Sequence, residues 1–204
     1  MSKFKKLIFT IISIMSLAAC QYNPISEEQA VEQGVNKEFI KLLDYEIQNR
    51  AFALGSMKVA VEHGEGDEPL PFWVAYLALE QLNQQRFAPI AKKYQLELAP
   101  RLWTRTRTTV GLWVSAIMPK TALKAIHSAT LKYVAQLQKL ERLSQPKDKA
   151  FFAYVVEQEE VQAAAVGLVL EGEIELATAM LDSFIADNLM VEPTDSGDEV
   201  LSGG

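Results

Sequence analysis

Six polar residues fall on stretches that are otherwise apolar at helical spacing, and their side chains suit a buried cluster of charges and hydrogen bonds. They are one arginine, two glutamates and three amides: Glu46, Arg50, Glu80, Asn83, Gln158 and Gln162. A guanidinium presents five donors in a fixed fork and keeps its charge at ordinary pH. We therefore expect Arg50 to bridge Glu46 and Glu80, with the amides and the Thr106 hydroxyl completing the network.

The same residues also allow a plainer arrangement at the surface. Glu46 and Arg50 lie four positions apart, a spacing that gives an exposed ion pair of a few tenths of a kcal/mol. Glu80 can reach water from the margin of a core. Even a buried network can serve only to fix the register of the helices, without binding a ligand. The two arrangements differ in whether the Arg50 guanidinium lies in solvent.

A second chemical feature is the only cysteine of the chain, Cys20, which follows a segment laid out like a secretory signal. Three lysines within the first six residues precede an apolar run from Leu7 to Leu17. The run closes in Leu17-Ala18-Ala19-Cys20, which resembles the lipobox of bacterial lipoproteins. The alternatives are an ordinary signal peptide with a stray thiol, or an uncleaved anchor, although the run is shorter than the roughly 20 residues of a spanning helix.

The lipoprotein resemblance implies a covalent lipid in place of any other cofactor. The Cys20 thiol would carry a diacylglycerol, cleavage would remove residues 1–19, and the new amino group would be acylated. Two or three acyl chains hold a protein on a bilayer far more firmly than one. Lipoproteins with aspartate after the cysteine tend to stay at the inner membrane, and Gln21 stands there in this chain. We expect a lipid anchor on the periplasmic face of the outer membrane.

Composition and charge limit the possible partners. The chain has 204 residues and a formal net charge of −6. Loss of residues 1–19 removes three lysines and no acidic residue, so the net charge becomes −9. Nucleic acid and anionic membrane surfaces require clustered Lys and Arg, and the acidic balance argues against both as partners. A single cysteine allows no internal disulfide, so the remaining residues must build a core of their own.

The chain divides into four parts. Residues 1–19 form the signal peptide, residues 20–36 a flexible tether, residues 37–189 the folded domain, and residues 190–204 an acidic tail of disordered composition. Helical periodicity runs through the folded domain, and no stretch alternates like a strand. We predict an all-α bundle of four to six helices, up-and-down, with a ferritin-like topology as the alternative. The expected helices cover residues 37–61, a segment from about 71 that bends at Pro89, 102–118, 120–143, 151–170 and 174–189.

Residues 39–189 resemble the ferritin-like superfamily, whose four long helices carry inward acidic and amide side chains. That family holds two metal ions with a glutamate on each of two helices and a Glu-x-x-His pair on each of the other two. Glu46 can take the place of the first glutamate. The second helix has Glu80 followed by Asn83 where histidine is expected, and the last helix has Gln158. These departures lead us to expect no metal site.

Glu157, Glu159 and Glu160 form a carboxylate cluster on the predicted helix over residues 151–170. Glu157 and Glu160 point away from the inferred core face. We therefore expect this cluster to lie on a solvated rim.

The sequence favours a non-catalytic role over an enzyme and offers no catalytic residues. It has no strand followed by a Gly-rich phosphate loop and no serine elbow motif, and acylation would consume its only thiol. The expected function is that of a lipid-anchored periplasmic protein whose helical domain binds an envelope protein or contributes to the envelope. The alternative is a degenerate ferritin-like bundle that binds a small ligand or a metal.

Overall fold

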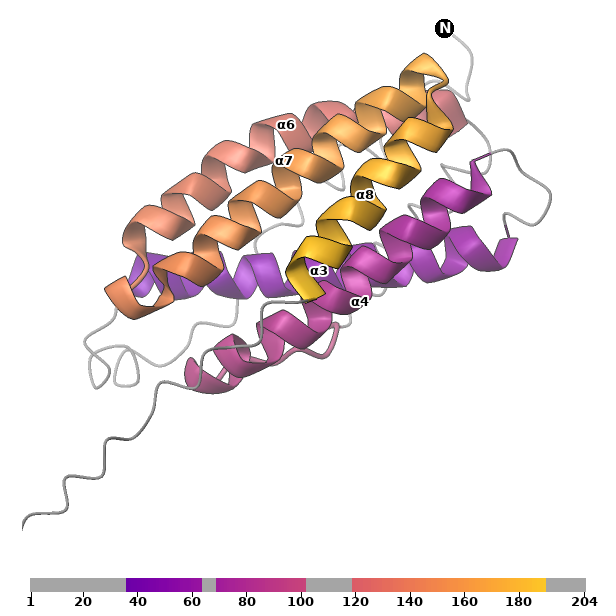
Figure 1. Ribbon diagram of the computed structural model, residues 1–204. Helices are drawn as coiled ribbons and strands as arrows, with labels where there is room; N and C mark the ends of the chain where they lie inside the picture. The colour runs from indigo at the N-terminus through magenta and orange to yellow at the C-terminus, as the bar shows by residue number, and fades with distance from the viewer. Residues whose placement is uncertain (1–35, 64–68, 102–118, 190–204) are drawn as a thin grey trace, which may run out of the picture.

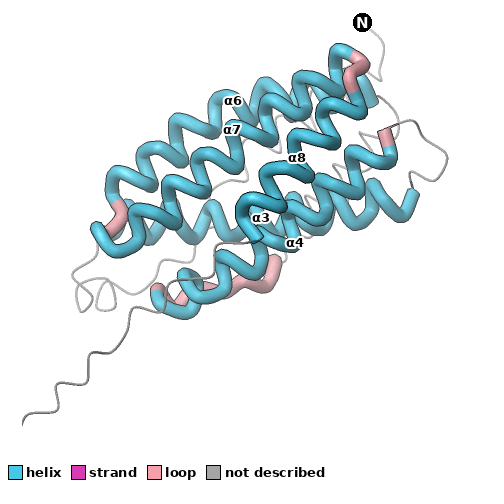
Figure 2. Tube along the Cα trace, viewed as in Figure 1, coloured by secondary structure: helices cyan, strands magenta, loops and turns pink. Residues whose placement is uncertain are grey.

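The computed structural model of the chain describes residues 36–63, 69–101 and 119–189, and these residues form a bundle of helices (Figure 1). The α-helices are α3 (Lys37–His63), α4 (Leu70–Lys93), α6 (Pro119–Leu143), α7 (Lys149–Glu171) and α8 (Ile174–Leu189). A short 3₁₀-helix, η1 (Pro146–Asp148), connects α6 to α7. The described residues contain no strand (Figure 2), and the predicted all-α bundle is confirmed.

Local sequence explains several helix boundaries. Proline occupies the first turn of α4, where a missing backbone N–H leaves no hydrogen bond unmade. Gly172 ends α7 with a φ of 92°, and the N–H of Glu173 donates to the Leu168 carbonyl at 2.9 Å. This is the left-handed glycine termination that leads directly into α8. Helix α4 continues through Pro89 to Lys93.

Several predicted segments lie outside the described residues. They are the signal peptide over residues 1–19, the tether up to residue 35, the predicted helix over residues 102–118 that contains Thr106, and the acidic tail over residues 190–204. Within the described parts of the chain, no helix is both long enough and apolar enough to cross a bilayer.

Contacts along α3 fix the directions of the neighbouring helices. Glu38 pairs with Lys139 and Glu46 with Tyr133, so α6 runs antiparallel to α3. Phe39 packs on Phe152, whereas Arg50 pairs with Glu159, so α7 runs parallel to α3.

Three of the helix-to-helix connections are up-and-down, namely α3 to α4, α6 to α7 and α7 to α8 (Figure 1). Helices α4 and α6 run in the same direction. The end of α4 and the start of α6 therefore lie at opposite ends of the bundle, so the described helices depart at this one point from the strict up-and-down order that was predicted.

Helix α8 closes the bundle by packing against both α4 and α7 (Figure 1). Arg86 of α4 donates to the Asn188 carbonyl at 3.0 Å, and its guanidinium lies 4.1 Å from the ring centroid of Tyr154 on α7. The Tyr154 ring in turn stacks on Phe184 of α8 with centroids 5.7 Å apart. Aromatic and cation–π contacts of this kind add to the apolar area that α8 buries.

Fully buried aromatic and aliphatic side chains fill the space on either side of the bundle's middle. Phe39 makes edge contacts with Tyr94 at 5.1 Å and Phe152 at 5.4 Å, which joins α3, α4 and α7. Burial of a side chain of this size stabilises the fold by about 1.5–3 kcal/mol. The apolar layers leave one polar layer between them, and that layer is the candidate site.

Candidate functional site

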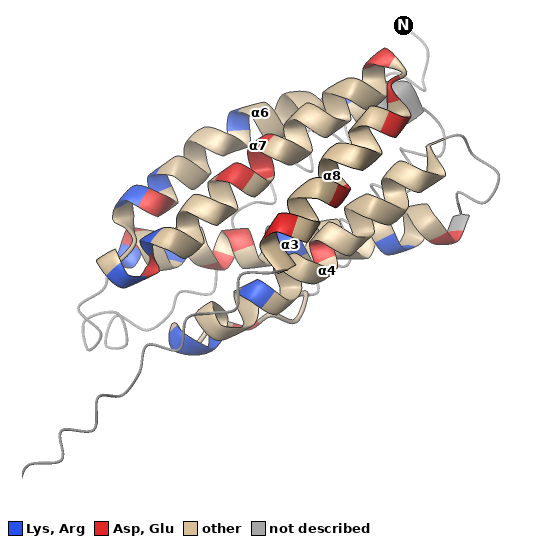
Figure 3. Cartoon of the chain, in the orientation of Figure 1, with Lys and Arg blue, Asp and Glu red and all other residues tan. Residues whose placement is uncertain are grey.

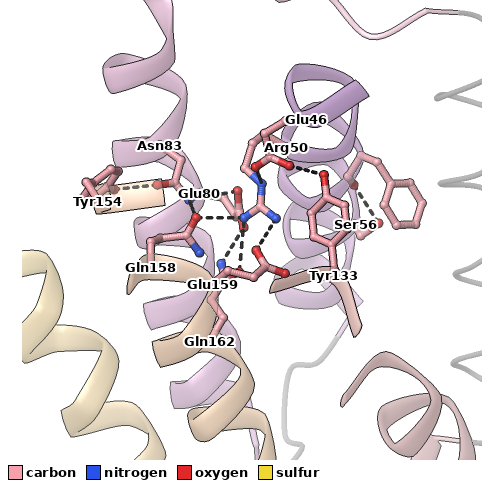
Figure 4. Close-up of polar contacts among 11 residues, drawn as sticks. Glu46, Arg50, Ser56, Glu80, Asn83, Tyr133, Tyr154, Gln158, Glu159 and Gln162 are labelled. Atoms are coloured by element: carbon pink, nitrogen blue, oxygen red, sulfur yellow. Dashed lines mark hydrogen bonds and ion pairs between the residues drawn. The ribbon is translucent and has the colours of Figure 1, made fainter. Parts of the chain in front are cut away.

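The polar layer is centred on Arg50, which extends from α3 into the bundle (Figure 4). Its exposed fraction is 6%, and the guanidinium contacts side chains from α4 and α7. All six residues singled out in the sequence are buried here, with exposed fractions of 0–6%: Glu46, Arg50, Glu80, Asn83, Gln158 and Gln162. The expectation of an exposed Glu46–Arg50 pair is therefore wrong, because apolar helix faces on both sides draw the pair inward.

One nitrogen of the guanidinium joins three helices. Arg50 Nη1 donates to Glu80 Oε1 at 3.1 Å, Gln158 Oε1 at 3.1 Å and Gln162 Oε1 at 3.2 Å. Gln162 Nε2 also donates to Glu80 Oε1 at 2.7 Å, so α4 and α7 are bonded to each other as well as to α3.

The other side of the guanidinium faces two more carboxylates. Arg50 Nη2 donates to Glu159 Oε2 at 2.6 Å. Arg50 Nε lies 2.9 Å from Glu46 Oε1, close enough for an ion pair, although the N–H is not aligned for a hydrogen bond. Arg50 is thus surrounded by three carboxylates, where two were expected.

Glu159 is the site residue whose position contradicts the sequence reasoning. It was expected on a solvated rim with Glu157 and Glu160, yet its exposed fraction is 4%. The buried positions of α7 include Phe152, Val155, Glu159, Gln162 and Val166, which recur at alternating three- and four-residue intervals. This spacing is the sequence signal that would have found Glu159, since it defines a second core stripe beside the one through Gln158.

Two tyrosine hydroxyls complete the layer, and neither was expected from the sequence. Tyr133 of α6 donates to Glu46 Oε2, and Tyr154 of α7 donates to Asn83 Oδ1 at 2.6 Å. Asn83 Nδ2 then donates to Gln158 Oε1 at 3.1 Å. Because Tyr133 lies on α6, the network takes side chains from four helices.

Negative groups outnumber positive ones in this interior. Burial raises the pKa of Glu46 to about 7 against the opposing effect of Arg50, and the nearby Glu159 carboxylate adds to the rise. Burial likewise raises the pKa of Glu159. Burial alone would lower the pKa of Arg50, but the carboxylates of Glu159, Glu80 and Glu46 raise it well above its ordinary value. Arg50 is the permanent charge, and Glu46 is the group that takes up a proton near neutral pH.

The hydroxyl donors of the layer stay protonated. Burial raises the pKa of Tyr133 above its ordinary value, with the charge of Glu46 adding to the effect. Burial also raises the pKa of Tyr154 to about 12. Gln158 Nε2 is buried and has no hydrogen-bond partner among the described residues.

The arrangement is better suited to holding the helices together and to taking up a proton than to binding a metal ion. The guanidinium occupies the space between the three carboxylates, and no group of three His, Cys, Asp or Glu side chains in the described ranges is placed to hold a metal ion. A pocket of about 190 Å³ lies beside the cluster between α3 and α4, and its lining includes Arg50, Glu80 and Lys58. Ile47, Leu54 and Phe87 make much of its wall apolar.

Comparison with known proteins adds no relative to this description. No family model matches the chain, and neither a curated protein nor a solved structure matches it.

Proposed function

We propose that this chain is a bacterial lipoprotein that is held on the periplasmic face of the outer membrane and presents a non-catalytic helical domain to an envelope protein. The observation that carries the proposal is the sequence Leu17-Ala18-Ala19-Cys20 after a basic and then apolar leader. The start of α3 at Lys37 supports it, because sixteen residues then separate the first helix from Cys20. A flexible segment of that length reaches about 20 Å.

The interior of the bundle supports a binding domain over an enzyme. The charged and amide groups of the polar layer bond mainly to one another, and together they hold four helices in register. Such a layer gives a rigid framework whose outer surfaces are available for contact with a partner. The partner would be a protein of the envelope, and the bilayer itself would be contacted through the acylated Cys20.

Substitution of the anchor residue tests the proposal. The wild-type protein should sediment with membranes, and the mass of its N-terminal peptide should exceed that of the unmodified peptide by a diacylglycerol and a fatty acyl group. Cys20→Ser should lose the added mass and should be released from membranes by a high-salt wash, whereas the neighbouring Ser26→Ala should keep both properties. Gln21→Asp should move the protein from the outer-membrane to the inner-membrane fraction of a density gradient. A wild-type protein without acyl mass would refute the assignment.

The pocket beside Arg50 and Glu80 favours a second candidate, a degenerate ferritin-like bundle that binds a small molecule or a metal. Elemental analysis of the purified, tag-free protein separates the two. Stoichiometric iron or manganese would support the second candidate, and specific capture of an envelope protein by the folded domain, absent with the heat-denatured domain, would support the first.

A further inference from the structure

The exposed cations of the described residues are concentrated at one end of the bundle (Figure 3). At this end α3 begins, α4 and α6 end, and η1 leads into α7. We define the basic end by its exposed cations: Lys37, Lys41, Lys92, Lys139, Arg142 and Lys147. The exposed acidic residues among them are Glu38 and Glu97.

Contacts between the four segments show that these cations share one end. Lys139 of α6 pairs with Glu38 of α3 at 2.5 Å. Lys93, the last residue of α4, pairs with Asp148 of η1.

The opposite end has the reverse balance. Among the residues whose side chains the structure describes at this end, the exposed charges are four glutamates, Glu62, Glu171, Glu173 and Glu175, against two lysines, Lys58 and Lys124. The bundle is therefore electrically polar along its length, a property that the net charge of the whole chain conceals.

The position of the basic end relative to the anchor gives this polarity a direction. Helix α3 begins at Lys37, so residues 21–36, which lead from Cys20, enter the bundle at the basic end. In an acylated chain this end lies within about 20 Å of the bilayer. Exposed charges act over about 10 Å at ordinary ionic strength, so such a tether lets the cations come within range of the headgroups.

We propose that the basic end docks on anionic phospholipid headgroups, so that the bundle stands on the membrane with its acidic end directed away from it. This inference rests on the proposed lipid anchor. Lysine and arginine near an anionic leaflet are attracted to it individually, and the effects accumulate over a cluster. The glutamates of the opposite end are repelled by the same surface, so both ends favour one orientation. The acidic net charge of the chain argued against an anionic membrane surface as a partner. Because the exposed glutamates gather at the opposite end, they favour the proposed orientation, and the docking end itself is basic.

Site-specific fluorescence quenching tests the orientation. The acylated protein is reconstituted into phosphatidylcholine vesicles with or without phosphatidylglycerol, and a single label is attached at Ala150→Cys near the basic end or at Leu176→Cys near the acidic end. Both positions are exposed. Headgroup nitroxides should quench the first label several-fold more than the second in anionic vesicles. The difference should disappear in neutral vesicles and at high salt.

Charge reversal supplies matched variants. The difference in quenching should be absent from the triple variant of the basic end, Lys92→Glu/Arg142→Glu/Lys147→Glu. The control is a triple variant with the same change in net charge away from the basic end, Lys58→Glu/Lys124→Glu/Lys132→Glu. It should retain the difference in quenching. All six positions are exposed, so both variants should keep the helical circular dichroism of the wild type.

A second measurement separates failure of the docking from failure of the anchor. The full chain with Cys20→Ser should co-sediment with anionic vesicles at least about tenfold more tightly than the same chain that also carries Lys92→Glu/Arg142→Glu/Lys147→Glu. Acyl mass on the native protein with equal quenching of both labels would overturn the docking while the anchor stands. Absence of acyl mass would overturn the anchor, and the co-sedimentation would still report on the basic end. If native envelopes shield the Ala150→Cys label from a quencher in the aqueous phase and anionic vesicles do not, the basic end binds an acidic protein. That result would also overturn the inference.

Discussion

Arg50 Nη2 and Glu159 Oε2 lie 2.6 Å apart in the interior of the bundle, although the two residues are 109 positions apart in the sequence. The pair belongs to a cluster in which one guanidinium offsets the charge of three carboxylates. Removal of the cation leaves those carboxylates in a medium of low polarity. Loss of one partner from a buried ion pair typically costs 3–5 kcal/mol, far more than loss of a surface pair.

Arg50→Met should therefore lower the free energy of unfolding at pH 7 by about 3–5 kcal/mol. Arg50→Lys should also be destabilising, because a single ammonium cannot reproduce the fork that contacts both Glu80 and Glu159. Urea unfolding followed by circular dichroism measures both effects. Lys58→Met, an exposed substitution on the same helix, should change stability by less than about 0.5 kcal/mol. Equal stabilities of Arg50→Met and Lys58→Met would contradict a stabilising role for the cluster.

The raised pKa of Glu46 predicts a pH dependence with a definite sign. The folded pKa is about 7, above the ordinary value of 4.5, so the folded state binds more protons than the unfolded state between these values. The contribution of Glu46 to stability is fully present below pH 4.5 and is lost as the pH rises through 7. This contribution is on the order of 3 kcal/mol.

Glu46→Gln isolates that contribution, because glutamine stays neutral at every pH. The free energy of unfolding of the variant minus that of the wild type should rise from pH 5 to pH 8. Glu157→Gln, an exposed change on α7, should give a difference that is flat over the same range. A parallel pH profile for Glu46→Gln and the wild type would show that Glu46 does not titrate in this window.

Tyr133→Phe should cost about 1–2 kcal/mol, because it removes the hydroxyl that donates to Glu46 Oε2. That hydrogen bond lowers the pKa of Glu46. Its loss should therefore raise the pKa further, and the cost should be greater at pH 8 than at pH 5. Tyr45→Phe is the matched control, since Tyr45 packs beside Tyr133 but is 40% exposed. Chemical unfolding of the two variants at both pH values makes the comparison, and a pH-independent cost for Tyr133→Phe would count against the hydrogen bond to Glu46.

Asp148 should stabilise the end of the bundle at which α4 meets η1. Its buried carboxylate accepts from Lys93 Nζ at 2.6 Å and from the Tyr94 hydroxyl at 2.5 Å. Asp148→Asn should lower stability by about 1–3 kcal/mol. It should also lower the pKa of Tyr94, which burial and the Asp148 carboxylate together raise. Ultraviolet titration of tyrosine checks the second effect, with Asp182→Asn on the exposed side of α8 as control.

Local sequence was sufficient to predict most of the helices. The observed ends of α3, α7 and α8 agree with the predicted ranges to within two residues. Proline in the first turn and glycine after the last turn are strong local signals, which explains this agreement. The interior position of Arg50 was also accessible to sequence reasoning, because apolar residues flank it at helical spacing on α3.

The remaining members of the site depend on how helices face one another, which periodicity along one helix does not specify. Tyr133 lies on α6, where no polar core position was expected, and it reaches Glu46 only because α6 packs antiparallel to α3. Glu159 lies about 100° around the helix from Gln158. A core face centred on Gln158 therefore leaves Glu159 on the solvent side. Contacts between helices place both residues in the cluster.

The sequence distances within the polar layer set the order in which the protein can assemble. Arg50 bonds to Gln158 and Gln162, which follow it by 108 and 112 residues. A chain that is synthesised from its N-terminus delivers the α3–α4 hairpin long before α7, so the guanidinium gains those amide acceptors only near the end of synthesis. Such distant pairings slow folding. Until α7 emerges, the apolar faces of the first hairpin remain uncovered, and the protein needs protection from aggregation during that interval.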